Sequence, residues 1–116
     1  MIRVKNRTRH IESIDIYGQC VSDYDVSPFE SIHMLHLRSN LYRVSQEFTH
    51  QERVKLLSYD VRLIIYAKEM CKHIREIYDF SLSNELLHQW WWHLDKIADG
   101  KITFSLIPVI DSDSAI

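Results

Sequence analysis

The clearest run of alternating apolar and polar positions lies between residues 28 and 47. Ser27 and Glu30 have the spacing of a capping box at its start, and Pro28 suits the first position of a helix. Apolar side chains then recur at steps of three and four residues, the period of one helix face: Met34, Leu37, Leu41, Val44 and Phe48. The pattern therefore predicts a helix over residues 28–47.

A longer amphipathic pattern follows over residues 50–78, and Thr49 and Glu52 repeat the capping-box spacing at its start. Apolar positions cover about half of the circumference of this segment, which is wider than the stripe of a helix that packs on one neighbour. We therefore expect a long central helix that packs on two neighbours or on a second copy of the chain. A homodimer is one assembly that this width predicts.

A third amphipathic segment spans residues 84–98 and is predicted to be a helix. Ser83 precedes it in the capping position, and Gly100 suits the left-handed backbone conformation that often follows the last turn.

Three consecutive tryptophans, Trp90 to Trp92, stand in the middle of this third segment. Successive residues of an α-helix are about 100° apart, so three neighbouring side chains cannot all face one core. The first two lie on either side of the core direction that Leu87 and Leu94 define. Trp92 points about 140° away from that direction, and we expect it to be exposed.

An exposed tryptophan is among the residue types most enriched in the hot spots of protein interfaces. The sequence therefore predicts a protein-binding surface around Trp92. Two intramolecular arrangements would also cover this ring: the segment 101–110 could fold back over it, or Lys96 could stack on it. The residues predicted to contact a protein partner are Trp92, His88, Trp91, Lys96 and Asp95.

The two ends of the chain give weaker patterns. Residues 11–26 fit a short helix or a strand, and we expect the helix. Residues 1–10 fit either an edge strand or a basic arm. Residues 101–110 alternate as an extended segment that Pro108 would restrict to the edge of a sheet, and an acidic, polar tail follows at 111–116.

The scarcity of turn-forming residues supports a helical fold. The chain has only two glycines and two prolines in 116 residues, whereas an all-β fold needs a turn about every 8–12 residues. We therefore predict an all-α protein, a small antiparallel bundle of three clear helices with a fourth short N-terminal helix. The expected organisation is a basic arm at 1–10, one helical domain at 11–110 and the tail at 111–116.

Composition places the chain among ordinary globular proteins, because 46% of its residues are hydrophobic and 26% are charged. No apolar run reaches the roughly 18 residues of a membrane span, and the first residues do not resemble a secretory signal. Cys20 and Cys71 lack the spacing of a zinc site, so we expect free thiols and a reducing, cytoplasmic location.

The charge distribution gives an alternative hypothesis, a nucleic-acid-associated accessory protein. The formal net charge is −2, yet the first ten residues contain four basic side chains and no acid. These residues could contact phosphates as an arm: Arg3, Lys5, Arg7 and Arg9. The rest of the chain is correspondingly acidic, which argues against a nucleic-acid-binding face on the helical domain.

A third hypothesis, a metal-binding bundle, comes from two E-x-x-H pairs, Glu30 with His33 and Glu85 with His88. Residues three apart share a helix face, and di-iron carboxylate bundles use pairs of this kind. Acids in a first helical turn are, however, also expected from capping and the helix dipole. His88 falls on the polar side of its predicted helix. We therefore expect no metal and no cofactor.

Sequence motifs for catalysis are absent. The chain contains no G-x-S-x-G, no G-x-G-x-x-G and no P-loop, and Cys71 falls on the apolar side of a predicted helix, where a thiol is inert. The leading interpretation is a non-enzymatic, cytoplasmic helical protein that acts through protein–protein contact as a regulator, an adaptor or an assembly subunit.

Overall fold

The computed structural model describes residues 8–104, and every regular element in that range is helical, which confirms the predicted all-α class. Five α-helices and three short 3₁₀ turns follow one another along the chain: α1 (Ile11–Cys20), α2 (Pro28–Arg43), η2 (Ser45–Glu47), α3 (His50–Ile65), α4 (Ala67–Ile74), η3 (Phe80–Leu82), η4 (Trp90–Trp92) and α5 (Leu94–Ala98).

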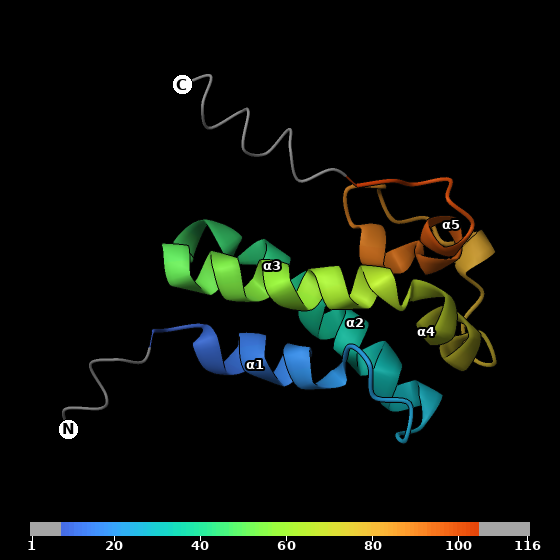
Figure 1. The fold of residues 1–116 in the computed structure, drawn as a ribbon, viewed down its shortest axis with the longest axis horizontal. Coiled ribbons are helices and arrows are strands. Elements are labelled where there is room, and N and C mark those ends of the chain that lie inside the picture. The colour runs from blue at the N-terminus through green and yellow to red at the C-terminus, as the bar shows by residue number, and fades with distance from the viewer. Residues whose placement is uncertain (1–7, 105–116) are drawn as a thin grey trace.

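The helices form a compact bundle in which α1 and α3 lie side by side and run in the same direction (Figure 1). Helix α2 returns in the opposite direction and packs against α1 and α4. Helices α4 and α5 pack together at the far end of the bundle, and η4 contacts α2. None of these helices is long and apolar enough to cross a membrane.

Both predicted capping boxes are present. The amide of Glu30 donates to the Ser27 hydroxyl at 3.3 Å, and the Glu30 carboxylate accepts from the Ser27 amide at 3.4 Å. Thr49 and Glu52 exchange the same two bonds at 3.1 and 2.8 Å. The predicted helix 28–47 is accordingly found as α2 continued by η2.

Glu52 also caps a second helix. Its other carboxylate oxygen accepts from the amide of His10, at the start of α1, at 2.7 Å. Burial by itself raises the pKa of Glu52, but the Thr8 side chain and the backbone amides of Thr49 and His10 together lower it by more, so the pKa lies below its usual value. One buried carboxylate therefore holds the first turns of α1 and α3 together.

The expected short N-terminal helix is confirmed as α1, and its Gly18 explains how closely α1 approaches α3. A Cβ atom at Gly18 would collide with the ring of Tyr59. The Tyr59 hydroxyl continues past this position and donates to Asp15 at 2.8 Å. A side chain of any size at Gly18 would therefore push the two helices apart.

The prediction of one continuous helix over residues 50–78 is wrong. Helix α3 ends at Ile65, and Tyr66 leaves the helical conformation with φ −102° and ψ 24° before α4 begins. The change of direction brings the inner side of α4 into the core that it shares with α2 and α5. The residues buried by this turn are Ala67, Met70 and Ile74.

The predicted helix 84–98 is also wrong as a continuous element. Residues 83–89 have no regular structure, Trp90–Trp92 form the 3₁₀ turn η4, and His93 with φ −133° and ψ 41° separates this turn from α5. The predicted helix is broken because its parts pack on different segments: η4 packs on α2, and α5 packs on α4.

The predicted end of this segment is confirmed. Gly100 has φ 76°, in the left-handed region that favours glycine. The amide of Lys101 donates to the carbonyl of Lys96 at 2.8 Å, and that of Gly100 donates to Ile97 at 3.1 Å. These two bonds form a Schellman motif.

The predictions for the chain ends can be followed only in part. Residues 8–10 and 101–104 contain no strand, and the remainder of the basic arm, of the extended segment and of the acidic tail lies outside the described residues. His10, which precedes the first residue of α1, packs against Phe48.

Candidate functional site

The tryptophans that dominated the sequence analysis lie inside the molecule. Trp91 is 1% exposed and Trp92 is 6% exposed, so the expected outward orientation of Trp92 is wrong. The expectation assumed an α-helical register through residues 84–98. In the 3₁₀ turn that is found there, successive side chains are about 120° apart and the backbone direction changes again at His93.

A single serine accepts hydrogen bonds from two of the indoles. The Nε1 atoms of Trp91 and Trp92 donate to Oγ of Ser39 at 2.9 and 2.8 Å. A hydroxyl oxygen has two lone pairs, so it can accept from both donors. Ser39 is itself buried on α2, and it fixes η4 against that helix.

Aromatic contacts surround these hydrogen bonds. The Trp92 ring lies 4.9 Å from His36 and 5.5 Å from Tyr78, measured between ring centroids. Half-buried Trp90 meets Phe104 edge to face at 5.6 Å. The tryptophan triplet is therefore a structural element that joins α2 to the last part of the described chain.

A buried ion pair lies beside the triplet. Arg38 donates from Nε and Nη2 to the two carboxylate oxygens of Asp60, each at 2.9 Å, and the Tyr17 hydroxyl donates to the same carboxylate at 2.6 Å. The Arg38 guanidinium lies 4.2 Å from the centroid of Trp91. Burial, reinforced by the charge of Asp60, raises the pKa of Tyr17, which remains a neutral donor.

Sequence reasoning missed this ion pair, although the pattern contained a signal. Arg38 lies four residues after Met34 and three before Leu41, so it occupies the inner face of α2. Asp60 lies between Leu56 and Leu63 in the same way on α3. Opposite charges on two apolar helix faces are expected to pair, because a buried charge without a partner is very costly.

The other residues predicted to contact a partner do not form one surface with the tryptophans. His88 is exposed and lies 5.3 Å from the ring of Tyr42. Asp95 and Lys96 are half-buried and pair with each other at 3.8 Å. Lys96 also lies 3.4 Å from the Nδ1 atom of buried His93, rather than on Trp92.

The E-x-x-H pairs are not arranged as a metal centre. The Glu30 carboxylate serves the Ser27 cap, and Glu85 and His88 stand in an irregular segment, where residues three apart no longer share a helix face. Within residues 8–104, no group of three His, Cys, Asp or Glu side chains is placed to hold a metal ion, His33 included.

Most of the basic arm lies outside the described residues, including Arg3, Lys5 and Arg7. Arg9 is described: its exposed guanidinium pairs with Glu47 at 3.3 Å. Arg9, the one Arg or Lys of the predicted basic arm that is described, is therefore already paired with an acid.

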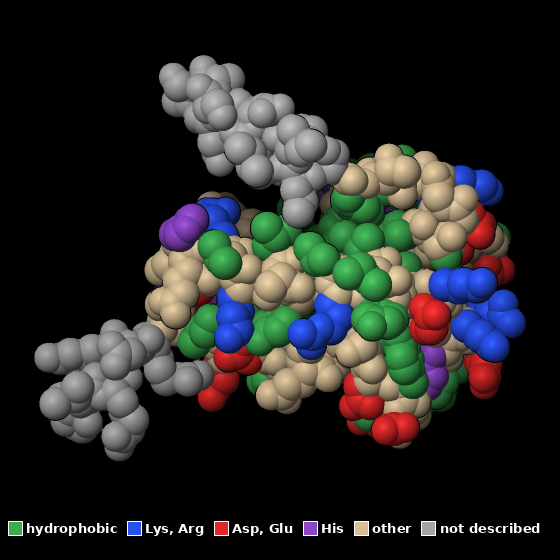
Figure 2. Space-filling view, viewed as in Figure 1, with side chains coloured by type: hydrophobic (Ala, Val, Ile, Leu, Met, Phe, Trp, Pro, Cys, Tyr) green, Lys and Arg blue, Asp and Glu red, His purple; other side chains and the backbone are tan. Residues whose placement is uncertain are grey.

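The outer face of α3 carries exposed apolar side chains. Val54, Leu57 and Ile65 are 53%, 46% and 66% exposed, and half-buried Val61 lies between them. Their spacing of three and four residues places them on one side of the helix. We call these four residues the outer stripe of α3. Figure 2 shows hydrophobic side chains gathered along this helix, with Lys and Arg side chains beside them.

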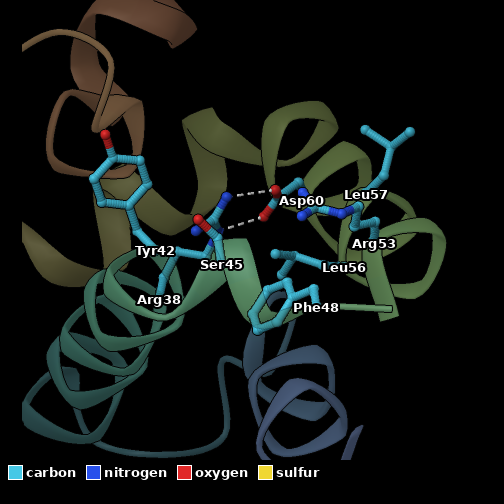
Figure 3. Close-up of a pocket in the computed structure, with 8 residues that line it drawn as sticks. All are labelled: Arg38, Tyr42, Ser45, Phe48, Arg53, Leu56, Leu57 and Asp60. Atoms are coloured by element: carbon cyan, nitrogen blue, oxygen red, sulfur yellow. Dashed lines mark hydrogen bonds and ion pairs between the residues drawn. The ribbon is translucent and has the colours of Figure 1, made fainter. Parts of the chain in front are cut away.

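A groove of about 280 Å³ opens next to the outer stripe, between the end of α2 and α3 (Figure 3). Leu57 and Arg53 extend from α3 at one end of the opening, and Tyr42 lies at the other. The Arg38–Asp60 pair lies within the groove. Its lining residues are Arg38, Tyr42, Ser45, Phe48, Arg53, Leu56, Leu57 and Asp60.

The charges of α3 are separated between its two sides. Its two acids, Glu52 and Asp60, are buried in the contacts described above. The charged side chains that remain exposed on this helix are basic: Arg53, Lys55 and Arg62. Lys55 pairs with Asp15 of α1 at 3.7 Å. The outer side of α3 therefore combines apolar area with positive charge.

Comparison of the chain with protein families, with curated proteins and with solved structures gave no match.

Proposed function

We propose that this chain is a non-enzymatic protein that acts through protein–protein contact, as a regulator, an adaptor or an assembly subunit. The observation that carries the proposal is the outer stripe of α3, which replaces the predicted surface around Trp92. The outward face of a helix in an isolated domain is normally polar, whereas here Val54, Leu57 and Ile65 are all about half exposed or more.

An apolar surface of this kind can contribute to binding. A partner that covered about 300 Å² of apolar surface, at about 25 cal/mol per Å², would gain about 7.5 kcal/mol before the entropic cost of association. A contribution of this size would be a substantial part of the free energy of binding a partner. The stripe is already exposed, so binding requires no rearrangement of the bundle.

The interior supports a non-enzymatic role. The most polar buried cluster, formed by Arg38, Asp60 and Tyr17, satisfies its own hydrogen bonds and serves to join helices. Burial raises the pKa of the Cys20 and Cys71 thiols, which disfavours the nucleophilic thiolate. Both cysteines are free, and we propose a reducing, cytoplasmic location on that ground.

The proposal is tested by replacing the outer stripe without altering the core. We expect Leu57→Ser combined with Ile65→Ser to leave the free energy of unfolding within about 1 kcal/mol, because both side chains are exposed. The same variant should lose capture of partners from a native lysate, or lose self-association measured by light scattering.

The matched control is Leu82→Ser combined with Leu87→Ser. These two leucines are 73% and 59% exposed but lie outside α3. If the control variant loses association and the α3 variant keeps it, the binding surface has been assigned to the wrong part of the molecule.

A further inference from the structure

Resting on the proposed function, we infer that the partner of α3 is an amphipathic helix of another protein whose apolar side chains are flanked by Glu or Asp. This helix lies along the outer stripe and inserts one bulky apolar side chain into the groove beside Leu57. Helices bound in this way present anchors at steps of three and four residues, the spacing that the outer stripe also has.

The acidic character of the partner follows from the charges beside the stripe. On a helix of 100° per residue, Arg53 lies about 40° beyond Leu57 on one side, and Arg62 lies about 60° beyond Ile65 on the other. Neither arginine has an ion-pair partner among residues 8–104. A carboxylate on each flank of a bound helix would meet a guanidinium that has no ion pair within the described part of the chain.

The apolar anchor follows from the groove. Arg38 and Asp60 lie within it, but their charges are neutralised by two mutual hydrogen bonds. Phe48 and Leu56 add apolar lining. With a volume of about 280 Å³, the groove has room for one large side chain and offers it apolar contacts and an aromatic rim at Tyr42.

A second copy of this chain fits the surface less well. An antiparallel two-fold contact between two α3 helices, centred on Leu57, would place Arg53 of both copies along one flank and Arg62 of both copies along the other, with no exposed acid of α3 on either flank. Like charges opposed across an interface are costly. A nucleic acid would pair with the arginines but would cover the apolar stripe with phosphates. The combination of charge and apolar area therefore favours an acidic amphipathic helix.

The test is fluorescence anisotropy of the full-length protein with two synthetic probes. The first probe is an 18-residue helical peptide with Leu and one Trp at steps of three and four residues and Glu on both flanks. The second has Lys in place of every Glu. We expect the Glu peptide to bind at least 10-fold more tightly at low salt, and we expect this preference to shrink as salt is added.

Two variants connect the binding to the structure. Arg53→Glu combined with Arg62→Glu should reverse the preference between the two peptides. Leu57→Ser should weaken both peptides alike. Thermal unfolding verifies that each variant is folded. If the charge-reversed variant does not fold, Arg53→Gln combined with Arg62→Gln replaces it. This neutral variant should abolish the preference between the two peptides.

Several results would overturn the inference. Equal binding of both peptides, or of neither, would contradict the acidic partner, while lysate capture that still depends on Leu57 and Ile65 would leave the proposed function standing. A dimer mass that disappears in the variant with Leu57→Ser and Ile65→Ser would identify a second copy as the occupant.

Two further occupants are distinguished in the same assay. If a 20-nucleotide RNA competes with the Glu peptide and loses its own binding in the Arg53/Arg62 variant, the surface binds nucleic acid instead. If Leu106→Ser combined with Ile110→Ser increases peptide affinity, the last segment of this chain is the occupant, because that segment also joins apolar residues to acids.

Discussion

Arg38 and Asp60 meet in the interior across 22 positions of sequence, with both hydrogen bonds of the guanidinium–carboxylate fork at 2.9 Å. Each comes from the apolar face of its own helix, and the Trp91 ring lies over the guanidinium. The pair joins α2 to α3 and lines the groove. The shape of the candidate binding surface therefore depends on this contact between the two helices.

Removing one member of this pair should destabilise the protein strongly. We expect Asp60→Ala to lower the free energy of unfolding by about 3–5 kcal/mol, because the Arg38 charge stays buried without a partner. Tyr17→Phe, which removes only one hydrogen bond to the same carboxylate, should cost about 1 kcal/mol. Urea denaturation measures both.

Replacing the whole pair provides the control for this prediction. Arg38→Met combined with Asp60→Leu should cost less than the sum of the two single changes, because no unpaired charge is left behind. An Asp60→Ala variant as stable as Tyr17→Phe would show that the pair contributes little.

Ser39→Ala should have a larger effect than the loss of one hydroxyl normally has. The change leaves the indole N–H groups of Trp91 and Trp92 without their acceptor, at about 1–3 kcal/mol for each donor. Ser58→Ala on the exposed side of α3 is the matched control and should stay within about 0.5 kcal/mol. Urea unfolding followed by tryptophan fluorescence compares them, and equal stabilities would contradict the shared acceptor.

Gly18→Ala tests the close contact between α1 and α3. Alanine would normally stabilise a helix interior by about 0.5–1 kcal/mol relative to glycine. Here its Cβ would collide with the Tyr59 ring, and we expect a net loss of about 1–3 kcal/mol in chemical denaturation. Adding Tyr59→Ala to Gly18→Ala should recover part of the loss that the collision causes, and no recovery would place the strain elsewhere.

The stability supplied by Glu52 should depend on pH. Its pKa in the folded state lies below the usual value of 4.5, so its contribution is complete above that value and disappears as the pH falls through the folded-state pKa. We therefore expect Glu52→Gln to be less stable than the unmodified protein at pH 7, with the difference narrowing below the usual pKa. Thermal unfolding at a series of pH values measures this.

Thr49→Ala is the control for that pH dependence. This change removes the other hydrogen bond of the same capping box and should lower the free energy of unfolding by about 1 kcal/mol. Because threonine does not titrate, this loss of stability should be the same at every pH. A Glu52→Gln difference that is equally constant would show that the carboxylate charge is not what holds α1 and α3 together.

The features that could be predicted from sequence are those that neighbouring residues determine. Ser27, Thr49 and Gly100 mark helix ends through hydrogen bonds to residues within five positions, and the structure has all three ends. The break at Tyr66 has no glycine or proline to mark it. It occurs because α4 packs in a different direction from α3, which is a property of the whole bundle.

The candidate site was predicted less well than the helix ends, because it too depends on contacts between residues far apart in sequence. The position of Trp92 depends on its hydrogen bond to Ser39, 53 residues away in sequence. The spacing of apolar residues within one segment cannot predict a contact between such distant residues. The wide apolar girth of the segment 50–78 did indicate that α3 has apolar residues on more than one side. The sequence thus contained the outer stripe, although the tryptophans drew the predicted surface to the wrong place.

The link from Ser39 to the two indoles also constrains the order in which the chain can assemble. Closing a loop of more than fifty residues costs entropy that only completed contacts repay, and the surface that receives η4 exists only once α2 is formed. We therefore expect the tryptophan turn to dock after α2 has formed, and a nascent chain that stops short of this turn would leave the part of α2 around Ser39 open to water.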